Sequence, residues 1–257
     1  MWWHTTRAIM KIIISPRFEH LRSFIEELPA HFADEGRMIH NGRNKIKVFN
    51  VGGTEINVKR YRRPIPINRF IYSFIRKPKG LRAYLYAARL LQHGIETPEP
   101  IAYIQENRFG MITDSYFIST QCAYPHMMYH FGEEDAENNR EFIEAFGRYM
   151  ATVHQAGILH KDLSPGNVLY DMRDGKWCFS LIDINRLQFR TVDVHRGCLN
   201  FARLWGQQDF FRILAKAYAE ARGADPDECL KWINEGRRKY MSAFDNPSDI
   251  GYDARIE

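Results

Sequence analysis

The sequence predicts an α+β fold in which a sheet-rich lobe is followed by a mainly helical lobe. Alternating apolar and polar residues, typical of strands, are concentrated in the first half of the chain. Apolar residues at helical spacing dominate from about Glu133 onward. With 257 residues and 45% hydrophobic side chains, the chain can fill one compact domain or two tightly joined lobes. Segregated strands and helices of this kind favour an α+β arrangement with a cleft between the lobes.

The first elements are an apolar run at Ile12 to Ile14 and an amphipathic helix. Ser15 and Pro16 have the residue types of an N-cap and a first helical turn, and apolar residues recur at helical spacing up to Pro29. Because proline cannot donate a backbone hydrogen bond, the pattern predicts that the helix stops there.

A β-hairpin is predicted next. The alternating runs KIKVFNV and TEINVKRY are joined by Gly52-Gly53, a two-residue turn that suits a hairpin. On the second strand Ile56 and Val58 share one face, so Lys59 lies on the opposite face.

The remaining elements complete the two lobes. A helical pattern runs from Pro64 to Gly94, and IAYIQE and SYFISTQC predict two more strands. The second half reads as helices with two short strands, and we place the lobes at residues 1–120 and 121–257. The expected second-half elements are a helix with the core stripe Phe142, Phe146, Tyr149, Met150 and Val153, strands at Val168 to Tyr170 and Phe179 to Ile182, and helices at Phe201 to Arg222 and Asp227 to Phe244.

Composition narrows the class of protein. The chain has 36 Lys and Arg against 31 Asp and Glu, a formal net charge of +5 that favours an anionic partner such as a nucleotide or a membrane surface. Its four widely spaced cysteines predict neither a zinc ribbon nor a disulfide framework and fit a reducing cytoplasm. No apolar run approaches the roughly 20 residues that cross a bilayer. No nucleic-acid-binding motif is present, so we expect no nucleic acid partner.

The residues that indicate chemistry lie in HKDLSPGNVLY, at 160–170, and in LIDINR. The spacing of Asp162 and Asn167 lets one loop present a carboxylate to a substrate hydroxyl and an amide to a metal-bound phosphate. Asp183 closes a short apolar run, so its carboxylate leaves a buried strand where it can reach a Mg²⁺ ion. Lys59, on a strand after a hairpin, suits a lysine that contacts the α- and β-phosphates of a nucleotide.

This ordered set resembles the protein-kinase-like superfamily, and more narrowly the lipopolysaccharide kinases, the Kdo and heptose kinases of Gram-negative bacteria. VKRY, GIETPEPIAYI, HKDLSPGNVLY, LIDINR and NFARLW carry the narrower resemblance, which covers about residues 40 to 222. The resemblance implies a two-lobed protein-kinase-like fold, with an N-terminal antiparallel sheet lobe that binds nucleotide and a mainly helical C-terminal catalytic lobe.

The resemblance also implies cofactors and roles. The phosphoryl donor is ATP with Mg²⁺; Asp162 is the catalytic base, Asn167 and Asp183 are the metal ligands, and Lys59 is the phosphate lysine. The stretch Ser119 to Ala123, with Gln121 and Cys122, corresponds to the hinge that holds adenine. In the nucleotide-covering turn HNGRN, at 40–44, Gly42 and Arg43 are the candidate phosphate-binding residues, because backbone amides and a guanidinium both bind phosphate.

One departure from the family pattern concerns Lys59. No Asp or Glu occurs between Glu55 and Glu96, so the following helix cannot supply the glutamate that pairs with this lysine in protein kinases. Leu85 stands about where the resemblance places that glutamate. Either Lys59 has another partner or activity is reduced, and a pseudokinase scaffold is therefore an alternative.

The class of acceptor is inferred from the length and content of the chain after Asp183. This remaining segment is short and has no A-P-E sequence, which favours a small-molecule or glycolipid acceptor over a protein. Residues 59–82 are rich in Lys, Arg and aromatic side chains and contain no acid, which suits peripheral contact with an anionic membrane surface, although a solvated helix face explains the pattern equally well. We therefore expect a cytoplasmic enzyme, and peripheral contact with the inner face of the inner membrane is one of the two interpretations of this segment.

Three further residues surround the predicted catalytic groups. His160 reads as a structural residue whose ring bonds to the backbone near Asp183 rather than as a catalyst. Lys161 and Arg186 flank the motif, where they either clamp the acceptor or the transferred phosphate or are simply solvated. The sequence thus predicts an ATP-dependent kinase that phosphorylates a sugar hydroxyl of the lipopolysaccharide inner core, with a pseudokinase or a kinase for a protein or small-molecule hydroxyl as alternatives.

Overall fold

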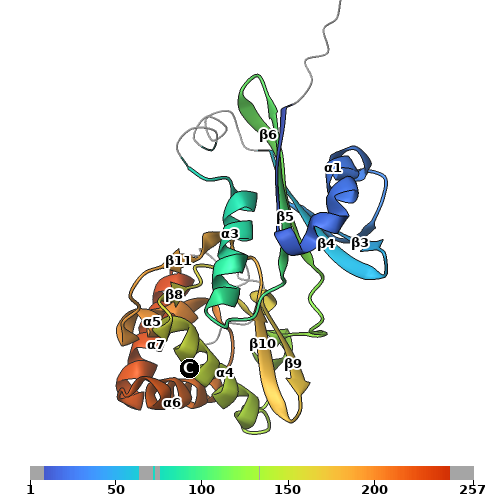
Figure 1. The fold of residues 1–257 in the computed structure, drawn as a ribbon. Helices are drawn as coiled ribbons and strands as arrows, with labels where there is room; N and C mark the ends of the chain where they lie inside the picture. The colour runs from blue at the N-terminus through green and yellow to red at the C-terminus, as the bar shows by residue number, and fades with distance from the viewer. Residues whose placement is uncertain (1–8, 64–71, 73–75, 133, 244–257) are drawn as a thin grey trace, which may run out of the picture. The chain divides into compact units, whose positions relative to one another are not determined.

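The computed structural model describes residues 9–63, 72, 76–132 and 134–243. The chain divides into two compact units, Met1–Ala123 and Tyr124–Glu257. Figure 1 shows the strands of the first unit and the helices of the second. The alternation in the first half and the helical periodicity in the second therefore predicted the right class of structure for each part.

The first unit is built on an antiparallel sheet of six strands in the order β1-β5-β6-β4-β3-β2. Every strand predicted in this half is present, and β2, an exposed strand, is added at the sheet edge. The bounds are β1 Ile9–Ile14, β2 Arg37–Asn41, β3 Lys45–Val51, β4 Thr54–Tyr61, β5 Pro100–Arg108 and β6 Met111–Thr120.

The predicted hairpin is confirmed as β3 and β4. Val51 pairs with Thr54, and the intervening Gly52 and Gly53 both have positive φ, 59° and 83°, as the tight turn requires. On β4 the side chains of Ile56 and Val58 are fully buried, while Lys59 on the other face is half-buried. The alternation of the sequence thus fixes the face from which Lys59 projects.

Helices cover both sides of this sheet (Figure 1). The 3₁₀ helix η1, Pro16–Leu21, and α1, Arg22–His31, bury apolar side chains in one core with the strands. The ammonium of Lys47 donates to the carbonyls of Ala33 and Glu35, just after α1 ends. On the other side α3, Lys79–Gln92, packs on β5 and β6, and Gly80 lies close to the ring of Tyr103.

In the first unit, two helices differ from the prediction. Pro29 lies inside α1, which continues to His31, because the buried Leu28 and Phe32 hold the last turn against the sheet. Tertiary packing here outweighs the backbone hydrogen bond that proline cannot donate. Of the helix expected from Pro64 to Gly94, the structure describes α3; residues 64–71 and 73–75, which are part of the basic and aromatic segment 59–82, lie outside the described residues.

The described part of the second unit contains helices and two small sheets. The β9–β10 hairpin pairs with β7, and β8 pairs with β11. Its elements are β7 His126–Met127, η2 Met128–Gly132, α4 Arg140–Gln155, β8 Ile158–Leu159, η3 Pro165–Asn167, β9 Val168–Arg173, β10 Lys176–Leu181, η4 Ile184–Arg186, β11 Gln188–Phe189, α5 Val194–Asn200, η5 Phe201–Arg203, α6 Gln208–Arg222 and α7 Pro226–Met241.

An aromatic core joins α4 to the β9–β10 hairpin. Phe142 and Phe146 are buried on α4, and the ring centroid of Phe179 on β10 lies 5.5 Å from that of each. Tyr149 stacks on the same Phe179 ring at 5.0 Å. The predicted stripe is therefore a core stripe, and it anchors the hairpin that leads to Asp183.

The helix predicted from Phe201 to Arg222 is interrupted: η5 covers Phe201–Arg203, and α6 begins only at Gln208. A further helix, α5, precedes both and begins at Val194. Asp193 is the N-cap of α5, and its carboxylate accepts a hydrogen bond from the backbone amide of Arg196 at 2.7 Å. Within the part of the chain that the structure describes, no helix is long and apolar enough to cross a membrane.

The aromatic core should carry much of the stability of the second unit. Phe146→Ala removes a fully buried ring and should lower the free energy of unfolding by about 3–5 kcal/mol in urea titrations. Phe109→Ala, at a side chain that is 72% exposed, should change it by less than about 0.5 kcal/mol. Equal losses for the two variants would contradict this assignment of the core.

Candidate active site

The predicted catalytic residues come together at one end of the β9–β10 hairpin. Val168 pairs with Leu181, so Asn167 stands opposite Ile182, whose amide donates to the Asn167 carbonyl at 3.0 Å. Asp183 is the next residue along the chain. The loop 160–167, which carries Asp162, ends in η3 immediately before β9.

Asp183 occupies the point where the chain leaves β10. Its backbone is left-handed, with φ 52° and ψ 43°, a conformation that aspartate tolerates better than most residues with a side chain. This turn ends the strand and starts η4. The Asp183 carboxylate accepts a hydrogen bond from the side-chain amide of Asn185 at 2.5 Å. Its direction is therefore set by both the backbone and a neighbouring side chain.

His160 connects the loop to the hairpin. Its ring is buried; Nε2 lies 3.0 Å from the Ile182 carbonyl, and Nδ1 accepts from the amide of Asp162 at 3.2 Å. The amide must donate, so Nδ1 is unprotonated and Nε2–H donates to Ile182. Burial lowers the pKa of His160, which favours this neutral form. The prediction of a structural histidine bonded to the backbone near Asp183 is confirmed.

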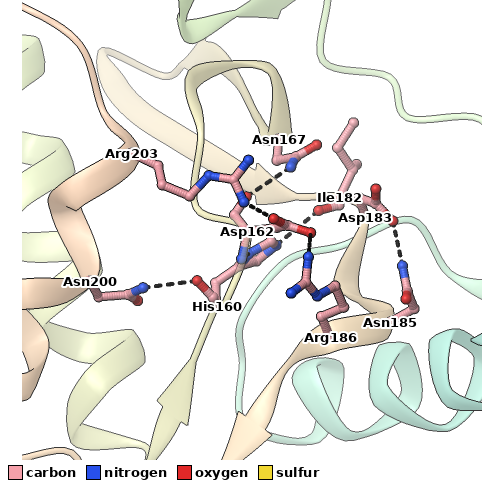
Figure 2. A network of polar contacts seen from close by, with 9 residues as sticks. All are labelled: His160, Asp162, Asn167, Ile182, Asp183, Asn185, Arg186, Asn200 and Arg203. Atoms are coloured by element: carbon pink, nitrogen blue, oxygen red, sulfur yellow. Dashed lines mark hydrogen bonds and ion pairs between the residues drawn. The ribbon is translucent and has the colours of Figure 1, made fainter. Parts of the chain in front are cut away.

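The Asp162 carboxylate lies between two guanidinium groups, as Figure 2 shows. Its Oδ2 accepts from Arg186 Nη1 at 3.0 Å, and its Oδ1 accepts from Arg203 Nη1. The side-chain amide of Asn167 donates to the Asp162 carbonyl at 2.8 Å. Asp162 and Asn167 are thus tied within one loop, and the Asp162 side chain is only 15% exposed.

A chain of buried and part-buried hydrogen bonds holds this loop to the helices. Asn200, at the end of α5, donates to the His160 carbonyl at 2.9 Å and accepts from His154 Nε2 at 3.2 Å. His154 Nδ1 lies 2.9 Å from the hydroxyl of Tyr218, which accepts from Arg222 at 2.9 Å. When His154 is neutral, its Nε2–H donates to Asn200 and its Nδ1 accepts from the Tyr218 hydroxyl, so each of these hydrogen bonds has one donor and one acceptor. The loop is therefore positioned by α4, α5 and α6 together.

Gly197 makes the close approach in this chain of bonds feasible. A Cβ atom at this position would lie 1.9 Å from the Tyr218 hydroxyl and 2.8 Å from His154 Nδ1. Both distances are shorter than van der Waals contact, so any larger residue must displace the network.

The donor set fits a hard divalent cation that also binds phosphate. Asn167 uses its amide nitrogen toward Asp162, which leaves its amide oxygen on the other side of the group, and Asp183 supplies a carboxylate. Among the described residues there is no group of three or more His, Cys, Asp or Glu side chains that could hold a metal alone. Few protein ligands, completed by water and substrate phosphates, are typical of Mg²⁺.

The residues predicted to bind nucleotide lie in the first unit. Gly42 and Arg43 form the exposed turn between β2 and β3. Lys59 lies on β4, with its ammonium 5.6 Å from the ring centroid of Tyr61. Gln121 follows β6. Its side-chain oxygen accepts a hydrogen bond from the Asn57 side chain at 2.8 Å, and its backbone amide donates to the backbone carbonyl of Glu55. Cys122 next to it is a half-buried free thiol.

Sequence reasoning missed two residues that contact the predicted catalytic loop. Asn200 and Arg203 both lie in NFARLW, a segment that the family resemblance included without assigning roles. Their spacing of three places both on one face of a helical turn, which is the signal that could have paired them. Arg186, which the sequence left open, contacts Asp162 directly.

An antiparallel sheet unit followed by a helical unit is the arrangement expected of a kinase-like fold. The chain belongs to the lipopolysaccharide kinase (Kdo/WaaP) family, whose family model matches residues 30–218. Members of this family are lipopolysaccharide kinases, so the protein is a phosphotransferase of lipopolysaccharide biosynthesis and uses ATP as kinases do.

Solved structures support the fold. One described as WaaP in complex with acyl carrier protein aligns with a TM-score of 0.62, covering 91% of this chain and 100% of that chain at 18% sequence identity. No curated protein sequence matches the chain significantly. The family resemblance and the kinase-like fold expected from the sequence are confirmed.

The buried network should make stability depend on pH. Burial lowers the pKa of His154 to about 4, below the roughly 6.5 of an unfolded histidine. A depressed pKa stabilises the fold fully above pH 6.5, and this contribution is lost as pH falls toward 4. Between about pH 7 and pH 4.5 the loss from His154 should be about 2–3 kcal/mol.

Urea unfolding at both pH values measures this loss. His154→Gln removes the titrating group, so this variant should lose about 2–3 kcal/mol less than the wild type on acidification. The same acid sensitivity in both proteins would contradict a neutral His154 in the folded state.

Proposed function

We propose that the protein transfers the γ-phosphoryl group of ATP to a sugar hydroxyl of the lipopolysaccharide inner core, on Kdo or heptose. The observation that carries the proposal is the meeting of Asp162, Asn167 and Asp183 at the end of the β9–β10 hairpin in a member of this family. A loop carboxylate beside metal-binding oxygens is the arrangement that phosphoryl transfer to a hydroxyl uses.

Asp162 is the proposed catalytic base. Its carboxylate would accept a hydrogen bond from the acceptor hydroxyl and take its proton as the new O–P bond forms. Placement matters more here than basicity, because the attacking oxygen loses its proton only as it bonds to phosphorus. The hydrogen bond from Asn167 to the Asp162 carbonyl and the contact with His160 support such placement.

Asn167 and Asp183 are the proposed ligands of Mg²⁺. When bound, the cation neutralises charge on the phosphate oxygens. Asp183 would hold its carboxylate in a fixed direction through its left-handed backbone and Asn185, and Asn167 would offer its amide oxygen. Both residues lie at the paired ends of β9 and β10, so the strand pairing fixes the distance between them.

The first unit supplies the proposed nucleotide contacts. Lys59 would reach the α- and β-phosphates, Gly42 and Arg43 would cover them, and Gln121 and Cys122 would face adenine. Lys59 lies on the face of β4 that is opposite the buried Ile56 and Val58, which supports its proposed contact with the phosphates. Because α3 carries no Asp or Glu, the electrostatic partner of Lys59 differs from that of protein kinases.

The proposed place of action is the cytoplasm, at the inner face of the inner membrane, where a glycolipid acceptor and ATP meet. The formal charge of +5 and the basic segment 59–82 support attraction to an anionic surface, and each basic residue near it contributes about 1 kcal/mol. Contact with the membrane is proposed to be peripheral.

Transfer of labelled γ-phosphate tests the proposal. The wild type should label Kdo-lipid A or a heptosylated acceptor, whereas Asp162→Asn should reduce turnover by about 10²–10⁴-fold and retain Mg·ATP binding. Equal turnover by the variant would remove Asp162 from its role. Binding of Mg·ATP without transfer to any core acceptor would favour a pseudokinase or a different hydroxyl.

The metal-ligand proposal is tested by Asp183→Asn, which keeps the left-handed backbone tolerable and removes one negative charge. Calorimetry should show Mg·ATP affinity reduced by about tenfold or more, since the carboxylate is the charged ligand. Asp174→Asn is the matched control: Asp174 is also left-handed, with φ 50°, and lies at the opposite end of the hairpin. Asp183 is not a metal ligand if both variants bind Mg·ATP like the wild type.

A further inference from the structure

The environment of Asp162 contains more positive charge than a catalytic carboxylate requires. Arg186 and Arg203 each donate to one of its two oxygens, so two guanidinium groups share a single carboxylate. Asp162 and its two arginines together carry one net positive charge, and Lys161 stands next to Asp162 in the chain. A surplus of guanidinium groups around one carboxylate is suited to bind a second anion.

Arg203 is held in position independently of Asp162. It ends η5, which packs against α7, and its guanidinium lies 5.5 Å from the ring centroid of Tyr240. The following loop is anchored by the buried Arg237, which donates to the Gly206 carbonyl at 3.2 Å. Such anchoring presents the Arg203 head group at low entropic cost.

Arg203 also retains hydrogen-bonding capacity. Its Nε is buried and makes no hydrogen bond with any residue that the structure describes. A guanidinium binds an oxyanion through two parallel N–H groups, so a shift of Arg203 that exposed this edge would let an incoming anion satisfy the buried donor. Arg186 is 57% exposed and can turn toward an incoming anion.

Aromatic rings flank the same loop. Tyr129 packs edge-to-face with Trp205 at 5.1 Å, and its ring closely contacts Gly166, the residue before Asn167. Trp205 lies two positions beyond Arg203 in the chain. Tyr129 is 45% exposed, so it offers an apolar surface against which the ring of a bound substrate can pack.

We propose that Arg203 and Arg186 bind an anionic substituent, a carboxylate or a phosphate monoester, on the acceptor sugar, and that this binding releases Asp162 to act as the base. In the structure both Asp162 oxygens are occupied by guanidinium donors. An anion on the acceptor competes for those donors, and the freed carboxylate then accepts the hydroxyl proton. The O–P bond forms at the acceptor oxygen as the bond from the γ-phosphorus to ADP breaks.

This inference rests on the proposed function, because it takes Asp162 as the base. It adds a rule for the acceptor: the enzyme selects a sugar that carries a negative charge near the phosphorylated hydroxyl. A neutral sugar of the same shape would leave Asp162 paired with both arginines and would react slowly.

Charged acceptors and their neutral counterparts test the rule. Two pairs of acceptors serve as probes. In the first pair, a methyl glycoside of Kdo is compared with its neutral methyl ester; in the second, heptose phosphate is compared with neutral heptose. The first pair tests recognition of a carboxylate and the second tests recognition of a phosphate. In wild type kcat/KM should be at least about tenfold higher for the charged member of one pair. Arg203→Gln should lower this ratio toward one, mainly by raising KM for the charged acceptor, and Arg203→Lys should restore part of it.

One further readout, measured in two variants, separates this role from a structural one. Hydrolysis of ATP by water, without acceptor, should increase several-fold in Arg203→Gln and in Arg186→Gln, because Asp162 loses one of its two partners. Arg186 is largely exposed, so its variant tests the same idea even where Arg203→Gln folds poorly. Arg212→Gln is the control, since Arg212 is an exposed arginine of α6 paired with Asp209, and it should behave like the wild type.

The outcomes are distinguishable from failure of the proposed function. If no core sugar accepts phosphate, the proposed function fails, and the arginine contacts are then judged by ATP hydrolysis alone. A wild type that treats charged and neutral acceptors alike, or arginine variants that lower both rates equally with no increase in hydrolysis, would overturn the inference.

Discussion

The hydrogen bonds of one uncharged imidazole, that of His160, hold together the two segments from which the candidate site is built. Its Nδ1 accepts from the amide of Asp162, and its Nε2–H donates to the carbonyl of Ile182, one residue before Asp183. A protonated ring could not accept from the Asp162 amide. The spacing between the proposed base and the proposed metal ligands therefore depends on a histidine kept neutral by burial.

The helices of the second unit extend this constraint. Asn200 fixes the backbone of His160 and is itself fixed by His154, which is again buried and neutral. Gly197 gives the Tyr218 hydroxyl room to reach His154. A fully satisfied buried network of this kind favours one arrangement of its members, so the loop with Asp162 is preorganised before any substrate binds.

The sequence predicted the parts of the structure that depend on local patterns. The β3–β4 hairpin, the core stripe of α4 and the loop spacing of Asp162 and Asn167 all depend on residues close in the chain. It missed β2, which is exposed on every residue and so shows no alternation, and it ended α1 at Pro29, where packing of Phe32 extends the helix. Asn200 and Arg203 reach the loop from about 40 positions away, a contact that only the tertiary fold determines.

The proposed reaction leaves the γ-phosphorus of ATP on a sugar hydroxyl. Phosphorus–proton correlation NMR on the product formed from Mg·ATP and Kdo-lipid A, or its heptosylated form, tests it most directly. The account predicts a new phosphate monoester whose phosphorus couples to a carbinol proton of Kdo or heptose. If the γ-phosphorus appears only as inorganic phosphate, or on a protein side chain, the account is contradicted.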